Sequence, residues 1–360
     1  MGGLVSAEWL KLFAGKRVLL TGDTGFKGSW LALWLSELGA DVVGYALPPE
    51  RPDDHFNLIQ LEKRIHHIDG DIRDLEKLAD VAAGFQPVFL FHLAAQSLVR
   101  LSYDRPKYTF DTNVGGSVNL LEIARLSTSL RCLIYVTSDK CYKNNEWVWG
   151  YRETDTLGGR DPYSASKAAA EFVFEAYGRS FFDDKPDFGA ASVRSGNVIG
   201  GGDWAEDRIV PDCVKSLRAN QPVTLRNPDS TRPWQHVLEP LSGYLRLAVA
   251  LNRSPSAFSG AWNFGPAGDS IRTVLDLAGQ FVKLWGSGKI NAAAEVNTLH
   301  EAKLLHLNCD KARRLLGWKP LWDFDRTVQE TVSWYKGFIA GTSPSQLSTQ
   351  QLRHYMESME

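Results

Sequence analysis

Two residues that can move a proton stand four positions apart in the string YSASK, where Tyr163 opens the string and Lys167 closes it. On a helix such residues share one face. A lysine ammonium close to a phenol favours the phenolate and lowers the tyrosine pKa. The spacing therefore predicts that Tyr163 acts as a base toward a hydroxyl group with the help of Lys167. Asp161-Pro162, directly before the string, is typical of a helix start.

A second reactive group, Ser138-Asp139-Lys140, follows the apolar run Cys132–Thr137. Side chains at the carboxyl end of a parallel strand face the crevice in which ligands bind. Ser138 is placed to bind the same oxygen as Tyr163, while Asp139 and Lys140 put an acid beside a base. The alternative interpretation is that Asp139 and Lys140 form a solvated turn pair.

Three glycines, Gly22, Gly25 and Gly28, are spaced Gly-x-x-Gly-x-x-Gly between an apolar run and an amphipathic segment. Such a turn lets the backbone approach a pyrophosphate at a helix N-terminus. The motif predicts a dinucleotide site, and the alternative is a tight turn without a ligand. The residues predicted to contact the cofactor here are Gly22, Thr24, Gly25, Phe26, Lys27 and Gly28.

Two later segments fit the same ligand. Asp71-Ile72 follows a predicted strand, where an acid can meet the adenine amino group, and Ala94, Ala95 and Gln96 end another strand with small residues. The acid that usually closes the second strand and binds the ribose of NAD is missing. Arg51 lies nearby and is suited to a 2′-phosphate, so the residues leave both NAD and NADP open.

Residues 16–195 alternate between short apolar runs and helical patterns, which indicates βαβ units and a parallel sheet. We predict an α/β protein: a Rossmann-type doubly wound sheet over residues 1–200, with segments near 225–265 returning to it. A smaller mixed α/β substrate lobe is expected over 201–345, and a loosely attached polar tail over 346–360. Strands are expected at Arg17–Leu20, Asp41–Tyr45, Ile65–Ile68, Val88–Leu93, Cys132–Thr137 and Ala190–Arg194.

The composition excludes several classes of protein. The chain has 360 residues, 44% of them hydrophobic and 23% charged, and a net charge of −2. A near-neutral balance argues against nucleic acid as a partner. No apolar run reaches the ~18 residues of a membrane helix, and the N-terminus has no secretory pattern, so we expect a cytoplasmic protein without membrane contact. The histidines and four cysteines show no metal-ligand spacing, and no metal is predicted.

These motifs resemble the extended short-chain dehydrogenases/reductases that modify nucleotide sugars, over about residues 16–340. Within that group the chain is similar to the 4,6-dehydratases, most of all to the branch acting on CDP-glucose. The strings that carry the resemblance are GDTGFKGSW (Gly22–Trp30), TSDKCY (Thr137–Tyr142), RSGNVIGGGDW (Arg194–Trp204) and RPWQHVLEP (Arg232–Pro240). The resemblance implies NAD as the cofactor and CDP-glucose as the substrate, in lipopolysaccharide O-antigen synthesis.

The resemblance also implies roles for individual residues. Tyr163, Ser138 and Lys167 would act at the C4 hydroxyl, where the positive nicotinamide ring would also favour the Tyr163 phenolate. Lys140 would remove the C5 proton, and Asp139 would protonate the leaving C6 hydroxyl. The related dTDP-glucose enzymes carry Thr-Asp-Glu where this chain has Ser138-Asp139-Lys140. A lysine is a base only when deprotonated, which leaves the identity of the C5 base open. Residues expected at the sugar, diphosphate and base are Asn197, Trp204, Arg208, Arg232, Trp234 and His236.

Other functions stay open on the sequence alone. One is a 4-epimerase, or a dehydratase for a GDP-, UDP- or dTDP-sugar, on the same scaffold; another is a non-catalytic NAD(P)-binding sensor. The pair Asp139-Lys140 favours dehydration, and the presence of Ser138, Tyr163 and Lys167 argues against the sensor. The resemblance further implies a homodimer or homotetramer, with Phe172, Val173 and Phe174 exposed on a two-helix face.

Overall fold

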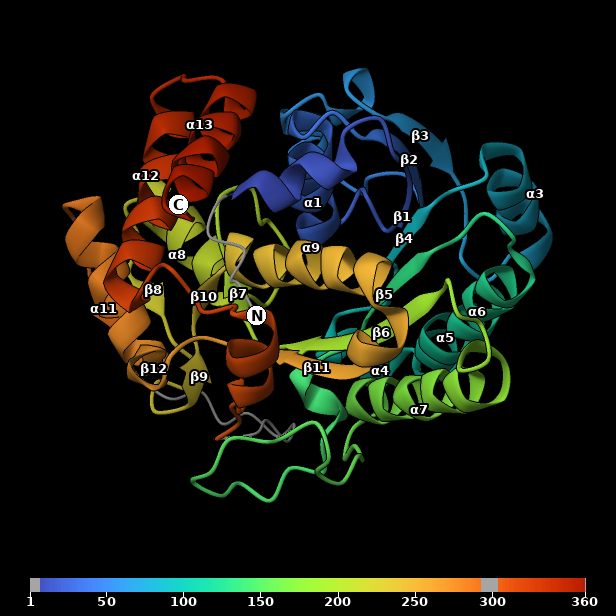
Figure 1. Ribbon diagram of the computed structural model, residues 1–360. Coiled ribbons are helices and arrows are strands. Elements are labelled where there is room, and N and C mark those ends of the chain that lie inside the picture. Colours follow the sequence, from blue (N-terminus) through green and yellow to red (C-terminus); the bar gives the residue numbers. More distant parts are fainter. Residues whose placement is uncertain (1–6, 293–303, 360) are drawn as a thin grey trace.

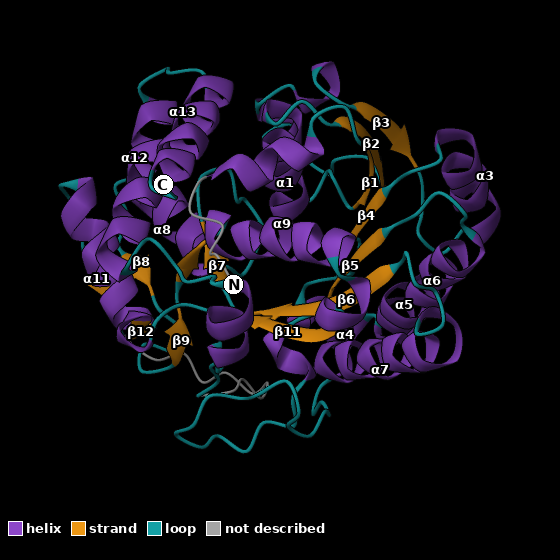
Figure 2. Ribbon diagram, in the orientation of Figure 1, coloured by secondary structure: helices purple, strands orange, loops and turns teal. Residues whose placement is uncertain are grey.

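A seven-stranded parallel sheet forms the centre of the molecule in the computed structural model, which describes residues 7–292 and 304–359 (Figure 1). Figure 2 shows the strands between two layers of helices. The sheet order is β11-β6-β5-β4-β1-β2-β3. The strands are β1 (Arg17–Thr21), β2 (Asp41–Ala46), β3 (His66–Asp69), β4 (Phe89–His92), β5 (Cys132–Val136), β6 (Gly189–Ser195) and β11 (Gly260–Phe264). The predicted Rossmann-type α/β fold is confirmed.

The central strands are apolar along their whole length because both faces of the sheet are covered. In β1, Val18 and Leu20 belong to one buried cluster and Leu19 to the other, as the alternation of side chains along a strand requires. Helices α3, α6 and α7 contribute to the cluster around Leu19, and α1 and α9 to the opposite one.

The helices of the first half are α1 (Phe26–Glu37), α2 (His55–Leu58), α3 (Leu75–Phe85), α4 (Val99–Asp104), α5 (Pro106–Phe110), α6 (Gly116–Leu126) and α7 (Pro162–Tyr177). Asp161 caps α7, its carboxylate accepting from the backbone N–H of Ser164 at 2.9 Å. This confirms the helix start predicted at Asp161-Pro162 and fixes the first turn, which carries Tyr163.

The second half of the chain forms helices around pairs of short strands. The helices are α8 (Ile209–Arg218), α9 (Leu238–Arg253), α10 (Pro255–Phe258), α11 (Val274–Trp285) and α12 (Phe324–Ile339). The strands are β7 (Val198–Ile199), β8 (Val223–Thr224), β9 (Thr231–Pro233), β10 (Gln235–His236), β12 (Ile271–Thr273) and β13 (Ile290–Asn291), which pair as β10 with β7, β12 with β9 and β13 with β8.

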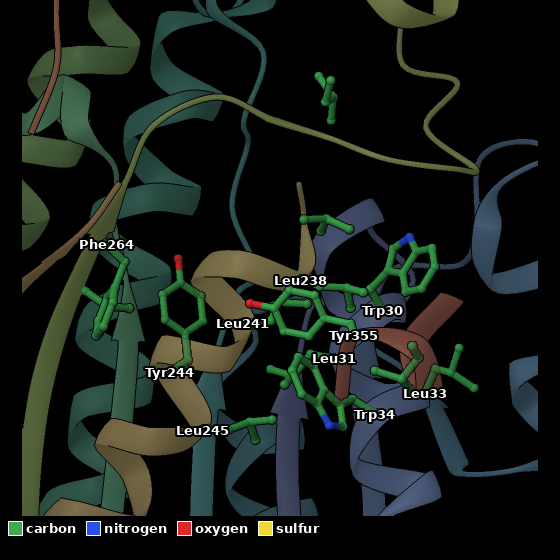
Figure 3. Packing of buried hydrophobic residues seen from close by; sticks show 14 of the residues in the cluster. Trp30, Leu31, Leu33, Trp34, Leu238, Leu241, Tyr244, Leu245, Phe264 and Tyr355 are labelled. Atoms are coloured by element: carbon green, nitrogen blue, oxygen red, sulfur yellow. The ribbon is translucent and has the colours of Figure 1, made fainter. Parts of the chain in front are cut away.

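The C-terminal residues correct the prediction of a loosely attached tail. Pro344–Glu357 form helix α13, which lies against α12 (Figure 1). Leu352 and Tyr355 are fully buried, and the Tyr355 ring meets Trp34 of α1 edge to face with centroids 5.7 Å apart (Figure 3). The prediction was wrong because the polar composition hid two apolar side chains on one helical face.

The predicted two-helix face also needs correction. Phe172 on α7 is 56% exposed, but Phe174 is buried and stacks on Tyr135 of β5. Along a helix, residues two apart point to different sides, so the two phenylalanines cannot share an exposed face. Among the described residues, no helix combines the length and apolar character needed to cross a bilayer.

Strand order fixes where a ligand can bind. From β1 the chain proceeds to β2 and β3 on one side, whereas β4, β5 and β6 follow on the other. The carboxyl ends of β1 and β4 therefore flank the point where the order reverses, and the crevice outside such a point is the usual ligand site of open parallel sheets.

Candidate active site

A cavity of about 1700 Å³ opens at the carboxyl ends of β1, β4, β5 and β6. Its walls include all the sequence-predicted site residues except His236. They are Gly22, Thr24, Gly25, Phe26, Lys27, Gly28, Asp71, Ile72, Ala94, Ala95, Gln96, Ser138, Asp139, Lys140, Tyr163, Lys167, Asn197, Trp204, Arg208, Arg232 and Trp234. Residues that were predicted from separate motifs thus line one cavity.

The glycine turn leaves room for a ligand by lacking side chains. A Cβ on Gly22, whose φ is +80°, would lie 2.6 Å from the backbone nitrogen of Ala94, and one on Gly28 would overlap the Gly22 carbonyl oxygen. Helix α1 begins after Gly25 without a side-chain cap. Its first N–H groups are therefore available to an anion, and the turn fits the pyrophosphate of a dinucleotide.

Asp23, inside the turn, points away from the cavity. Its fully buried carboxylate accepts from Nδ1 of His67 at 2.7 Å and lies against Gly44 of β2, where any Cβ would overlap it. Burial alone would lower the pKa of His67, but the hydrogen bonds and charges of Asp23 and Asp69 raise it. The His67 ring thus supplies the partner that this negative charge needs so close to an anion site.

The remaining cofactor-side residues are held by local contacts. Asp71 forms a salt bridge with Arg73 at 2.6 Å, and the Gln96 amide donates to Thr109 at 2.9 Å. Lys27 Nζ donates to Ser195 Oγ at 2.6 Å, and burial lowers the Lys27 pKa to about 8. The hydrogen bond from the Gln96 amide to Thr109 holds the strand end in shape.

The proton-transfer residues gather at the middle of the cavity. Lys140 Nζ lies 6.0 Å from the Tyr163 ring centroid, and Ser138 Oγ donates to Asp139 Oδ1 at 3.0 Å. Burial raises the Asp139 pKa against the opposing charge of Lys140, so this side chain favours its protonated form more than a free carboxyl does. Asp139 is thereby suited to give a proton.

The Tyr163 pKa depends on burial as well as on neighbouring charge. Burial raises it to about 12, although the hydrogen bond of Ser138 acts in the opposite direction. Burial also lowers the Lys167 pKa to about 8, with the charge of Glu171 opposing. Among the protein's own side chains, removal of the phenol from water outweighs the nearby cation Arg208. The predicted lowering, which also counts the positive nicotinamide ring, stays a prediction.

The substrate side is lined by arginines that donate to oxygen atoms of the protein. Arg208 Nη1 lies 3.0 Å from Asp203, and Arg232 donates to the Thr231 carbonyl oxygen at 2.8 Å. Asn197 is exposed to the cavity. Trp204 and Trp234 are both at most 4% exposed, so each presents only an edge to the cavity.

His236 does not line the cavity. It is fully buried and packs between Trp30 and Trp322, with ring centroids 6.1 Å and 4.8 Å away. Burial lowers its pKa to about 3, which keeps the ring neutral. The structure therefore contradicts a direct substrate contact for His236. Its neighbours Gln235 and Val237 are fully buried as well and do not line the cavity, whereas Trp234 does, a difference that a sequence string does not reveal.

Sequence reasoning missed a charged bridge at the cavity mouth. Asp207 lies 3.3 Å from Arg100 of α4 and also pairs with Arg226, which in turn lies 3.2 Å from Asp212. All four side chains line the cavity. These residues are scattered over more than 100 positions, so no local spacing signals them. No cluster of potential metal ligands occurs among the described residues.

The sheet, the glycine turn and the Tyr163–Lys167 pair define an extended short-chain dehydrogenase/reductase. A family model described as GDP-mannose 4,6 dehydratase matches residues 19–331, and the chain belongs to that family. More particularly, it is 48% identical to the CDP-glucose 4,6-dehydratase of Salmonella typhimurium over 348 residues, which are 96% of this chain and 97% of that protein.

Solved structures support the fold. A dTDP-glucose 4,6-dehydratase from Bacillus anthracis in complex with NAD has a TM-score of 0.76 and 21% identity, and covers 92% of this chain and 100% of its own. A UDP-glucose 4-epimerase from Stenotrophomonas maltophila with bound NAD has a TM-score of 0.78 and 21% identity, with coverages of 91% and 100%. Dehydratases and epimerases share this fold, so the reaction must be argued from side chains.

Proposed function

We propose that the protein is a CDP-glucose 4,6-dehydratase, which converts CDP-glucose to CDP-4-dehydro-6-deoxyglucose and water with NAD as its cofactor. The observation that carries the proposal is the acid–base pair Asp139 and Lys140 at the same cavity as Tyr163 and Lys167. An epimerase needs a base at C4 only, whereas loss of water across C5 and C6 needs a second base and an acid. The 48% identity to a CDP-glucose enzyme supports the choice of nucleotide.

The cofactor residues are proposed from their fit. Gly22, Gly25 and Gly28 would hold the pyrophosphate, Asp71 and Ile72 the adenine, and Ala94, Ala95 and Gln96 the path toward the sugar, with Thr24, Phe26 and Lys27 completing the wall. Bound NAD would accept a hydride from C4 and return it to C6, so the reaction needs no external oxidant. Arg51 donates one N–H to the Trp204 carbonyl oxygen and keeps its charge, so the choice of NAD over NADP is supported by the NAD-bound structures of the fold rather than by this residue.

Oxidation at C4 would depend on α7. Tyr163 accepts the proton of the C4 hydroxyl, and Ser138 holds the same oxygen by a hydrogen bond. Because burial raises the Tyr163 pKa to about 12, the phenolate requires the positive charge of Lys167 nearby. This charge is present only while Lys167, whose pKa is about 8, keeps its proton.

Dehydration would depend on the segment after β5. Once C4 is a ketone, the C5 proton is acidic and Lys140, in its amine form, removes it. Asp139, whose pKa is raised by burial, protonates the C6 hydroxyl, which leaves as water. After C6 has received the hydride, C5 takes a proton back. Asn197, Arg208 and Arg232 would bind the sugar and diphosphate, with Trp204 and Trp234 at the base or sugar.

The wider setting belongs to the same proposal. Residues 1–200, with returning segments near 225–265, would form the cofactor-binding domain, and residues 201–345 mainly the substrate lobe; β11 at the edge of the sheet supports the return. We propose a cytoplasmic homodimer or homotetramer that supplies a 4-keto-6-deoxy sugar for O-antigen dideoxysugars.

The test is incubation of the purified protein with NAD⁺ and CDP-glucose, followed by detection of the 4-keto-6-deoxy product. Formation from CDP-glucose with dTDP-, GDP- and UDP-sugars inert supports the proposal in full. Turnover of another nucleotide sugar alone moves the substrate assignment but keeps the mechanism. Epimerised product without loss of water overturns it. In Lys140→Ala, undiminished dehydration would remove Lys140 from the scheme.

A further inference from the structure

A buried ion pair beneath the cavity contacts both ends of the segment that carries the acid and the base. Glu171 of α7 and Arg194 of β6 are at most 4% exposed. They form two N–H···O bonds, 2.8 Å from Nε to Oε1 and 2.9 Å from Nη2 to Oε2. This two-pronged arrangement fixes orientation as well as distance. Neither residue lines the cavity, so the pair is not expected to touch a ligand.

The glutamate of this ion pair contacts the residue before residues 138–141, the reactive segment that carries the acid and the base. Thr137 directly precedes Ser138, and its Oγ1 donates to Glu171 Oε1. The Thr137 backbone N–H also donates to the Val193 carbonyl oxygen at 2.9 Å. The end of β5 is therefore tied by its side chain to α7 and by its backbone to β6.

The arginine of the ion pair contacts the residue after the reactive segment. Tyr142 directly follows Cys141, and its hydroxyl accepts from Arg194 Nη1 at 2.7 Å and donates to Asn263 Oδ1 at 2.9 Å. The Arg194 guanidinium also lies 4.8 Å from the Tyr142 ring centroid. Thr137 and Tyr142 thus flank residues 138–141 on both sides, and both contact the same ion pair.

The reactive segment has little regular structure of its own. It holds one short 3-10 helix, Asp139–Cys141, in which Ser138 Oγ accepts from the Lys140 N–H at 3.2 Å. Tyr163 and Lys167 need no such support, since a long helix fixes their relation. A displacement of about 1 Å in a reacting group can lower a rate about 100-fold, so the acid and base must be held from elsewhere.

We propose that Glu171 and Arg194 are positioning residues for dehydration: by holding Thr137 and Tyr142, they fix where Asp139 and Lys140 stand relative to C6 and C5 of the sugar. The inference rests on the proposed function for the identity of the step. It does not rest on it for the mechanical claim, which concerns the order of residues 138–141 in the protein alone.

The test removes the contact of Thr137 or of Tyr142 with the ion pair and leaves the charges of Glu171 and Arg194 in place. Thr137→Val and Tyr142→Phe each delete one hydrogen bond to the ion pair, and Tyr142→Phe also deletes the one to Asn263. Both residues line the cavity, and both substitutions keep the shape of the side chain. We expect each to lower kcat for CDP-glucose about 10-fold, with KM within about twofold, since loss of one of the two flanks should displace the acid and base by less than the 1 Å that costs about 100-fold. Thr137→Ser, which restores the hydroxyl, should recover most of the activity.

Ser192→Ala is the matched control. Ser192 Oγ donates to Glu171 Oε2 at 2.8 Å but lies on β6 and touches neither flank. This variant breaks a hydrogen bond to the same carboxylate, and its kcat should stay within about twofold of the wild type. An equal loss in Ser192→Ala would mean that the carboxylate serves stability in general and would overturn the proposal.

Two further readouts separate position from mere stability. Rapid quenching should show more enzyme-bound sugar that is oxidised at C4 but still carries the C6 hydroxyl in Thr137→Val and Tyr142→Phe. Amide hydrogen exchange without substrate should rise at residues 138–142 in both variants and not in Ser192→Ala. Unchanged exchange and unchanged kcat overturn the positioning role even if the wild type is a dehydratase. A wild type inactive on every nucleotide sugar, with exchange altered as expected, overturns the proposed function instead.

Glu171→Gln is the more drastic variant. It leaves the Arg194 charge without its partner in the interior, which by itself can prevent folding. The Thr137 and Tyr142 variants keep the proposal testable in that case. If Glu171→Gln does fold, its kcat should fall about 100-fold, further than either flank variant, because both flanks lose their common support.

Discussion

The two sides of the cavity are built by different means. On the cofactor side, Gly22 and Gly28 make space by having no side chain, and the contacts that shape the turn are backbone contacts. On the substrate side, Arg208 and Arg226 supply charge, and each is held by an aspartate, Asp203 and Asp207 respectively. We therefore expect the cofactor side to select its ligand by shape and the substrate side by charge.

This difference governs how each side should respond to change. A backbone cradle has no side chain to lose, so only an added atom disrupts it. A charged wall tolerates small changes of shape but depends on every guanidinium and on the salt concentration. Damage to one side should therefore leave the affinity of the other largely intact, and the predictions below test that independence.

The largest effect is expected from Gly28→Ala. The new methyl would overlap the Gly22 carbonyl oxygen, which is backbone and cannot move aside cheaply. The start of α1 must then shift, and we expect NAD affinity to fall at least about 100-fold, as a 1 Å displacement at a site can cause. Titration of NAD followed by protein fluorescence measures this.

Gly84→Ala is the control for that experiment. Gly84 lies within α3, and a Cβ there would meet nothing within 4 Å. We expect unchanged NAD affinity and a stability gain of about 0.5–1 kcal/mol, as for alanine over glycine in a helix. Equal NAD affinity in Gly28→Ala and Gly84→Ala would show that the turn does not hold the cofactor.

On the substrate side, Arg208→Gln should raise the dissociation constant for CDP-glucose about 10-fold, because a charge-assisted hydrogen bond is replaced by a neutral one. The NAD dissociation constant should change by less than about twofold. Isothermal titration of each ligand decides the point. Arg218→Gln, on the exposed end of α8, should change neither, and a loss of NAD affinity in Arg208→Gln would break the separation of the two sides.

A pH profile tests the helix that lies between the two sides. Burial lowers the Lys167 pKa to about 8. The protonated form is the one that stabilises the Tyr163 phenolate, and it is lost as the pH rises through this value. We expect kcat to fall about 10-fold between pH 7 and pH 9. Lys167→Arg, which stays charged, should lose this alkaline decline even if its kcat is lower. An identical decline in both would assign the titration to another group.

The same contrast explains what could be predicted from the sequence. The cofactor side is contiguous: Gly22–Gly28 and Ala94–Gln96 are short strings whose backbone shape follows from residue type. The parallel sheet was predictable for a similar reason, since apolar runs such as Val18–Leu20 must be covered on both faces. Tyr163 and Lys167 could be paired because helical spacing alone brings them together.

The rest depends on distant partners. Asp207 contacts Arg100 only after folding. Glu171 stands four residues after Lys167 in the sequence, but its role depends on the ion pair with Arg194, which the sequence does not show. Burial was equally invisible. The string around His236 predicted a ligand contact, whereas the ring lies in the core, and the Tyr163 pKa follows its burial rather than its sequence neighbour. Sequence motifs name residues well but do not report which of them are buried away from the cavity.

The smallest effect is expected where the chain joins the two sides without touching either ligand. Helix α13 binds His55 of α2 through Ser348 at 2.9 Å and Glu239 of α9 through the Tyr355 hydroxyl at 2.7 Å. Glu239 is fully buried and also accepts from the backbone N–H groups of Leu321 and Trp322. Neither Glu239 nor Tyr355 lines the cavity.

Tyr355→Phe removes one of the donors to the Glu239 carboxylate. Burial already raises the Glu239 pKa to about 7, so this group destabilises the fold as it ionises with rising pH, and loss of a donor enlarges that cost. We expect a loss of about 1–2 kcal/mol at pH 8 and less at pH 6, where the carboxyl is mostly protonated. Urea unfolding at both pH values measures it, with Ser358→Ala at the exposed helix end as the control. Both dissociation constants should stay within about twofold; a change in one alone would mean that α13 belongs to that side rather than joining the two.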